Sequence, residues 1–147
     1  MEFVLSGALV VGTFFLHFAL LRSFAFRFNQ EIRFFKRPLL VVIFALFAIH
    51  LVEVLLYAIG FYILELLGAG SLDALDVGRG IPFSDYFYFS IACYTTLGIG
   101  DIVPHGGSRF MAGIEGLNGL VLITWSASYT YLMMERLWSD QFSASED

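Results

Sequence analysis

The residues whose types and spacing most clearly suggest a chemical role are "TTLGIGD", positions 95–101, which lie between long apolar segments. Gly98 and Gly100 alternate with aliphatic residues, and glycine adopts a positive φ without steric penalty. Every second residue can therefore adopt a positive φ, and this alternation allows successive carbonyl groups to face the same side. A row of carbonyl oxygens repeated around an axis can replace the hydration shell of a cation. The stretch therefore predicts a cation pathway.

The composition places this stretch in a membrane. Hydrophobic residues make up 59% of the 147 residues and charged residues 14%, against about 45–50% and 25% in soluble domains. Irregular backbone at membrane depth is tolerated only where it is buried in protein or lines water. The single cysteine, Cys93, excludes a disulfide framework within one chain.

Three apolar runs are long enough to cross a bilayer as helices, at residues 3–21, 39–67 and 110–137. The first is expected to be a permanent span rather than a signal peptide, because no base precedes it. The second exceeds the length of one crossing, so it must tilt, bend near Gly60 or project outward.

A short half-helix is expected between the second and third crossings. Ser84 is predicted as its N-cap, with Asp85 in the first turn, and residues 85–95 would form about three turns. The preceding residues 68–80 are turn-rich and suit an extracellular connection. No internal repeat appears, so the chain carries one copy of the loop.

The distribution of basic residues predicts the topology. Five of the eight bases lie in one stretch: Arg22, Arg27, Arg33, Lys36 and Arg37. The positive-inside rule makes this stretch cytoplasmic, with the N-terminus outside and the C-terminus inside a plasma or inner membrane. Anionic lipids would attract it at the interface, although an ordinary topology-setting loop is the favoured interpretation. The acidic final ten residues are expected to be disordered.

Residues 96–101, T-L-G-I-G-D, resemble the T-V-G-Y-G-D signature of potassium channel selectivity filters. The resemblance extends over residues 82–119, because an aromatic pore helix precedes the signature, "DIVP" follows it, and an inner helix begins near Arg109. It implies an all-α membrane protein with three transmembrane helices, a re-entrant pore helix and a filter loop between the second and third, assembling as a homotetramer.

Three regions follow from this resemblance. Residues 1–37 would be an N-terminal transmembrane helix with a basic interfacial linker, residues 38–138 the pore domain, and residues 139–147 a short cytoplasmic tail. No helix carries arginine at every third position, so a voltage sensor is not expected.

The resemblance implies stacked K⁺ sites formed by Thr96, through its hydroxyl and carbonyl, and by the carbonyls of Leu97, Gly98 and Ile99. Gly98 and Gly100 would supply the required dihedrals. No other cofactor and no nucleic-acid partner is implied. Isoleucine replaces the family's tyrosine, whose hydroxyl anchors the filter, so a nonselective monovalent cation pore remains the alternative.

Several further residues are candidates for supporting the filter. Asp101 would brace it or concentrate cations at its mouth, and Thr95 and Glu115 would support the pore helix. Ser90, Tyr94 or backbone amides are the expected partners of Glu115, although direct ion contact is possible for it. The resemblance makes Gly119 a possible hinge of the inner helix, with close helix packing as the alternative, and suggests that Asn118 faces the cavity.

His50 and Glu53 lie three residues apart on one helical face. They are expected to hydrogen-bond to each other or to the first helix, where His17 lies. Such a buried group is either a structural pair or a proton-linked gating element.

Two other classes of function compete with a channel. An enzyme is not expected, because neither an activated nucleophile nor a metal-ligand pair at helical spacing accompanies the buried carboxylates. A non-conducting membrane scaffold subunit is the second alternative, in which the filter-like loop would be purely structural.

Overall fold

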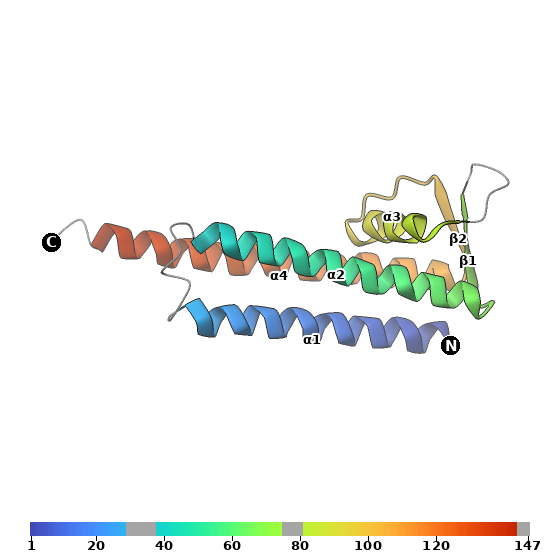
Figure 1. The fold of residues 1–147 in the computed structure, drawn as a ribbon, viewed down its shortest axis with the longest axis horizontal. Coiled ribbons are helices and arrows are strands. Elements are labelled where there is room, and N and C mark those ends of the chain that lie inside the picture. Colours follow the sequence, from blue (N-terminus) through green and yellow to red (C-terminus); the bar gives the residue numbers. More distant parts are fainter. Residues whose placement is uncertain (29–37, 75–80, 144–147) are drawn as a thin grey trace.

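The computed structural model describes residues 1–28, 38–74 and 81–143. Most of the basic segment predicted to be cytoplasmic and to bind lipid falls in residues 29–37, outside the described residues. In the described part, three long helices lie along one another, and a shorter helix with two strands lies at one end of them (Figure 1).

The three long helices are α1 (Glu2–Phe28), α2 (Pro38–Leu66) and α4 (Gly107–Ser143). Each is long and apolar enough to cross a membrane, which confirms the three expected crossings. The N-terminus lies at the same end of the bundle as the two strands, and the C-terminal end of α4 lies at the opposite end (Figure 1).

Helix α1 continues beyond the predicted end of the first apolar run and reaches Phe28. The guanidinium of Arg22 lies 5.5 Å from the ring centroid of Phe26, four residues on, where helical neighbours meet. The start of the basic segment is therefore a helical extension of the first crossing.

The predicted half-helix is α3 (Phe83–Tyr94). Its N-cap is Pro82, which has an extended backbone and no side-chain cap, so the assignment of Ser84 as N-cap was wrong. Ser84 instead lies in the first turn, where its hydroxyl donates to the Asp85 carboxylate at 3.3 Å. Proline suits the cap position because its fixed φ and missing N–H are tolerated at a helix start.

Two short strands, β1 (Gly70–Ala74) and β2 (Ile102–Gly106), were not predicted. They pair antiparallel, with Leu72 opposite Pro104. The sheet joins the segment after α2 to the segment after the filter-like strip. It therefore fixes the outer end of that strip against the end of the bundle.

The expectation of disorder over the last ten residues was wrong up to Ser143, where α4 ends. A helix satisfies its own backbone hydrogen bonds, so it can continue past the apolar run into polar sequence. The remaining residues 144–147 lie outside the described residues.

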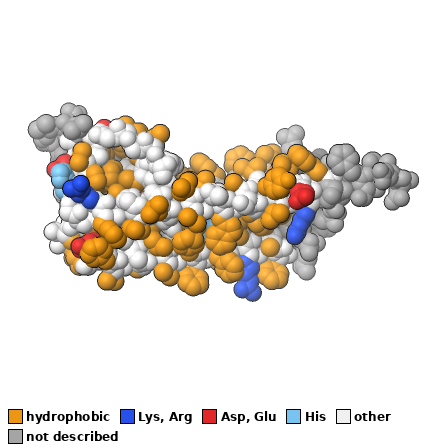
Figure 2. Space-filling view, turned by 180° about the vertical axis from the view of Figure 1, so that it is seen from behind, with side chains coloured by type: hydrophobic (Ala, Val, Ile, Leu, Met, Phe, Trp, Pro, Cys, Tyr) orange, Lys and Arg blue, Asp and Glu red, His pale blue; other side chains and the backbone are white. Residues whose placement is uncertain are grey.

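The core lies where α2 meets the other helices, and lipid-facing side chains cover the outside. The rings of Phe61 and Phe89 meet edge to face at 5.1 Å, in a buried cluster that includes Tyr57 and Met111. Helix α2 runs without interruption through Gly60, where an added Cβ would lie 2.7 Å from Leu9 Cδ1. Hydrophobic side chains cover the middle of the face in Figure 2, with charged side chains toward its two ends.

Candidate ion-conduction site

The strip after α3 has an alternating backbone. Thr96, Gly98 and Gly100 have positive φ angles of 57°, 55° and 87°. The angles at the two glycines confirm the predicted alternation, whereas the angle at Thr96 was not predicted. A positive φ is uncommon for any residue other than glycine and is unusual for a β-branched one such as threonine. Such strain costs about 1–3 kcal/mol and persists where the surrounding structure requires it. The surrounding structure therefore imposes a defined backbone conformation on the strip.

The inner end of the strip is attached to the C-terminal turn of α3. The Thr96 amide donates to the Cys93 carbonyl and the Leu97 amide to the Ala92 carbonyl, each at 2.9 Å. The Thr95 hydroxyl donates to the Ile91 carbonyl at 2.7 Å. The negative end of the α3 dipole thus lies beside the strip, where it favours a cation.

The outer end of the strip is held by a side chain from α3. The Tyr88 hydroxyl donates to Asp101 Oδ2 at 2.8 Å. This bond to the Asp101 carboxylate raises the pKa of Tyr88, because it favours the protonated phenol. This contact attaches the outer end of the strip to α3, while the roles of Asp101 in bracing a filter and in attracting cations stay predictions.

Within one chain the strip is exposed along its whole length, from Thr95 to Asp101. Leu97 is 65% exposed and Ile99 is 54% exposed. Leu117 and Leu120 on α4 are also exposed. The strip and part of α4 therefore present apolar surface that one described chain leaves uncovered.

The carboxyl group of Glu115 is fully buried on α4 and lies in short contact with the Ser90 hydroxyl, one of its expected partners. Ser90 Oγ also lies 2.8 Å from the Val54 carbonyl oxygen. One hydroxyl hydrogen serves only one acceptor, so a protonated Glu115 that donates to Ser90 would complete both contacts. The two contacts of Ser90 link α3 to α2 and to α4.

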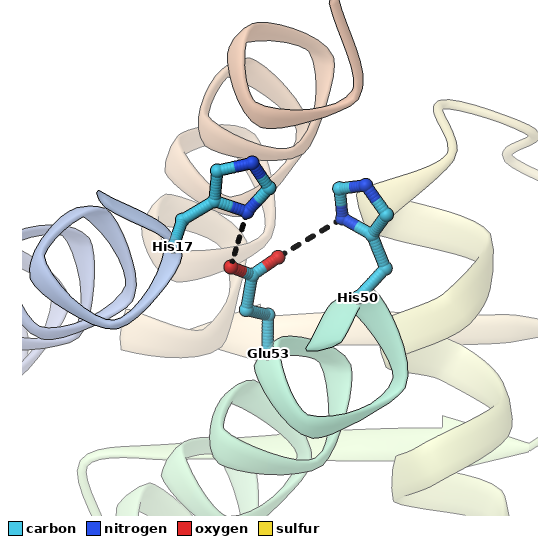
Figure 3. Close-up of side chains that lie close together, drawn as sticks. All are labelled: His17, His50 and Glu53. Carbon is cyan, nitrogen blue, oxygen red and sulfur yellow. Dashed lines mark hydrogen bonds and ion pairs between the residues drawn. The ribbon is translucent and has the colours of Figure 1, made fainter. Parts of the chain in front are cut away.

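A second buried carboxylate, Glu53 on α2, lies between His17 of α1 and His50 (Figure 3). Its two oxygens lie 3.0 Å from His17 Nδ1 and 3.0 Å from His50 Nδ1, so both expected pairings occur together. The Tyr94 hydroxyl donates to Glu53 Oε2 at 2.5 Å. Ser126 Oγ on α4 lies 2.9 Å from His50 Nε2 and 3.1 Å from His17 Nε2. A proton-linked gating role stays a prediction.

Asn118 does not face a cavity, so that expectation was wrong. Its amide is buried and donates to Thr13 Oγ1 at 2.8 Å and to the Tyr57 hydroxyl at 3.1 Å. The neighbouring Gly119 lies so close to α3 that an added Cβ would be 2.2 Å from the Tyr94 carbonyl oxygen. Close packing is thus present at Gly119, and its hinge role stays a prediction.

The contact of Thr13 on α1 with Asn118 was not predicted from the sequence, although a bond from the first helix to His50 or Glu53 was. Ser6, Thr13 and His17 are all buried and lie at intervals of seven and four residues, on one face of the helix. This polar face in an otherwise apolar span was the available signal. It was missed because the partners on α2 and α4 are distant in sequence.

The fold and the strip together define a class of protein: a membrane-spanning pore-loop protein, in which a half-helix and an alternating backbone strip connect two crossings. The chain belongs to the ion channel family, whose model matches residues 40–136. It is an integral membrane ion channel. The matched region begins in α2 and ends in α4, so α1 lies outside it. No curated protein and no solved structure gives a significant match.

The two buried glutamates are expected to respond oppositely to the same substitution. Glu53→Gln should destabilise the fold, because Glu53 has contacts with His17, His50 and Tyr94, and an amide offers those donors only one acceptor. A buried donor without a partner costs about 1–3 kcal/mol. Glu115→Gln should stay within about 1 kcal/mol of wild type, because its amide can donate to Ser90 as a protonated carboxyl does.

Thermal unfolding of the purified protein in detergent measures both effects. Equal loss of stability in the two variants would contradict the assignment of an acceptor role to Glu53 and a donor role to Glu115.

Proposed function

We propose that four copies of this chain form a potassium channel, in which residues 96–100 line the filter. The observation that carries the proposal is the alternation of positive φ at Thr96, Gly98 and Gly100. This alternation allows carbonyl groups to face one side in succession, which is the arrangement that replaces water around a dehydrated cation. Passive conduction, and not catalysis, is the proposed activity.

The apolar surface of the strip supports the tetramer. One chain offers one row of carbonyl groups, so a ring of ligands requires further copies around an axis. Leu97 and Ile99 are mostly exposed in one chain, and contact with a neighbouring copy would cover them. The proposed outer mouth is at Asp101, on the side of the membrane where the N-terminus lies, with the C-terminus and the basic linker cytoplasmic and anionic lipid at that linker.

The strictness of selectivity rests on Ile99, which cannot form the hydroxyl bond of the family's tyrosine. We expect Ile99→Tyr to preserve or raise the permeability ratio of potassium to sodium, because a hydroxyl could anchor the strip from behind. Reversal potentials of the variant and wild type in the same bilayers provide the measurement. A marked fall in the ratio would show that the position needs an apolar side chain.

The proposed function is tested by reconstituting the purified protein in bilayers with opposed potassium and sodium gradients. A reversal potential near the potassium equilibrium value is expected, together with a tetramer in cross-linking or native mass spectrometry. A reversal potential near zero would favour the nonselective cation pore. Anion permeation would overturn the filter assignment, and a tetramer without current would favour the scaffold subunit.

A further inference from the structure

We propose that His17, His50 and Glu53 form a binding site for a divalent transition-metal ion of the zinc class. The three side chains converge from α1 and α2 (Figure 3). Their ligand atoms all lie within 4.8 Å of one another. The sequence alone did not predict a metal site, because one of the two histidines comes from a different helix.

The donor set matches the chemistry of zinc. Two imidazole nitrogens and one carboxylate are a ligand set that zinc sites use, with a fourth position left to water or another group. Zinc lies about 2.0–2.2 Å from such ligands, so neighbouring ligand atoms of a tetrahedral site are about 3.3 Å apart. Here each oxygen of Glu53 lies 3.0 Å from one imidazole nitrogen, His17 Nδ1 or His50 Nδ1. Small side-chain adjustments would therefore admit the ion between them.

Ser126 supplies the outer contacts that histidine ligands require. Its Oγ atom lies within 3.1 Å of His17 Nε2 and 2.9 Å of His50 Nε2. With a metal ion on both Nδ1 atoms, each ring carries its hydrogen on Nε2, and the two lone pairs of the serine oxygen accept both. The Tyr94 hydroxyl meanwhile donates to Glu53 Oε2 at 2.5 Å, and such a bond orients a carboxylate ligand.

One arrangement of two neutral rings leaves a hydrogen-bond deficit that a bound ion would remove. If both rings direct an Nδ1–H group at Glu53, both Nε2 atoms are acceptors, and the single Ser126 hydrogen can satisfy only one of them. A metal ion on the Nδ1 atoms removes this deficit. One additional proton on either ring would also remove it. So would the tautomer of His50 that donates from Nε2 to Ser126 and accepts at Nδ1 from the Tyr94 hydroxyl, 2.8 Å away. The experiment must therefore separate a bound ion from these proton arrangements.

Burial and access are both compatible with a bound ion. The side chains of His17 and Glu53 are fully buried, whereas that of His50 is 18% exposed and provides the side of entry. A bound ion would fasten α1, which lies outside the matched channel region, to the pore module. It would also act near Tyr94, the residue that directly precedes the strip.

The test uses the purified full chain in detergent, stripped with a chelator and titrated with Zn²⁺ or Co²⁺. We expect about one ion per chain and the intense visible absorption of four-coordinate cobalt. His17→Gln should weaken binding by more than about 100-fold. His105→Gln is the matched control and should leave binding unchanged, because His105 is the remaining histidine of the chain and pairs with Asp73 on the exposed sheet.

Ser126→Ala keeps all three ligands and is expected to weaken Zn²⁺ binding about 10–100-fold. It carries the test if His17→Gln fails to fold. The proposal is overturned if the stripped wild-type protein binds neither Zn²⁺ nor Co²⁺ in the titration, in which case protons alone complete the network. It is also overturned if His105→Gln removes the binding or if cobalt shows only the weak absorption of six-coordinate sites. These readouts are independent of conduction, so they stand whatever the proposed potassium selectivity proves to be.

Discussion

Gly98→Ala is expected to abolish potassium current. Gly98 has a φ of +55°, and an added Cβ would meet nothing within 4 Å in one chain, so the effect comes from the backbone rather than from a clash. An L-residue in this conformation costs about 1–2 kcal/mol, and four copies in the proposed pore would add to roughly 4–8 kcal/mol. Relaxation of this strain would turn a carbonyl group away from the ion path.

Gly68→Ala provides the matched control. Gly68 has a φ of +63° and the same open surroundings, but it lies in the turn after α2. The two variants should therefore lose similar stability per chain, while only Gly98→Ala loses current in reconstituted bilayers. Normal current and selectivity in Gly98→Ala would show that the backbone of this strip does not line the conduction pathway.

Gly119→Ala is expected to destabilise the fold severely. The added Cβ would lie 2.2 Å from the Tyr94 carbonyl oxygen and 2.9 Å from the Tyr94 carbonyl carbon. Overpacking costs about 1–3 kcal/mol and occasionally more. The cost at Gly119 should lie at the upper end of this range, because the added Cβ would clash with backbone atoms, which cannot rotate away. The displaced Tyr94 would also strain its bond to Glu53. Thermal unfolding in detergent and the yield of folded protein measure the effect.

Gly12→Ala is the control for the helical substitution itself. Gly12 lies within α1 with nothing within 4 Å of an added Cβ, so alanine there should be neutral or stabilising by up to about 1 kcal/mol. A Gly119→Ala protein of normal stability with altered opening would instead support the hinge role. Equal stability of both variants together with unchanged opening would contradict close packing and the hinge alike.

The strip at residues 95–101 could be located from the sequence because its signal is local. The alternation of glycine with aliphatic residues specifies backbone conformation directly, since glycine alone reaches positive φ freely. Thr96 is the exception: nothing in its residue type predicts a φ of 57°. That angle is imposed by the anchoring of the strip to the end of α3.

The unexpected sheet shows where local signals fail. Gly70–Ala74 reads as a polar turn, and it becomes a strand because Ile102–Gly106 lies beside it. A strand of five residues is too short to show a clear alternation of apolar and polar residues, and its partner lies far away in the sequence. The error at Ser84 has a similar origin, since several polar residues and a proline offered competing positions for one helix start.

The sequence by itself determined that the chain spans a membrane with three helices and carries one glycine-punctuated strip, because apolar length and glycine spacing act over neighbouring residues. Only the tertiary structure decided which polar groups meet inside the bundle. His17, Glu53 and Ser126 come from three helices, and their contacts depend on how those helices are rotated against one another. Within an apolar bundle a buried polar group is stable only with a partner, and packing selects which partner it finds.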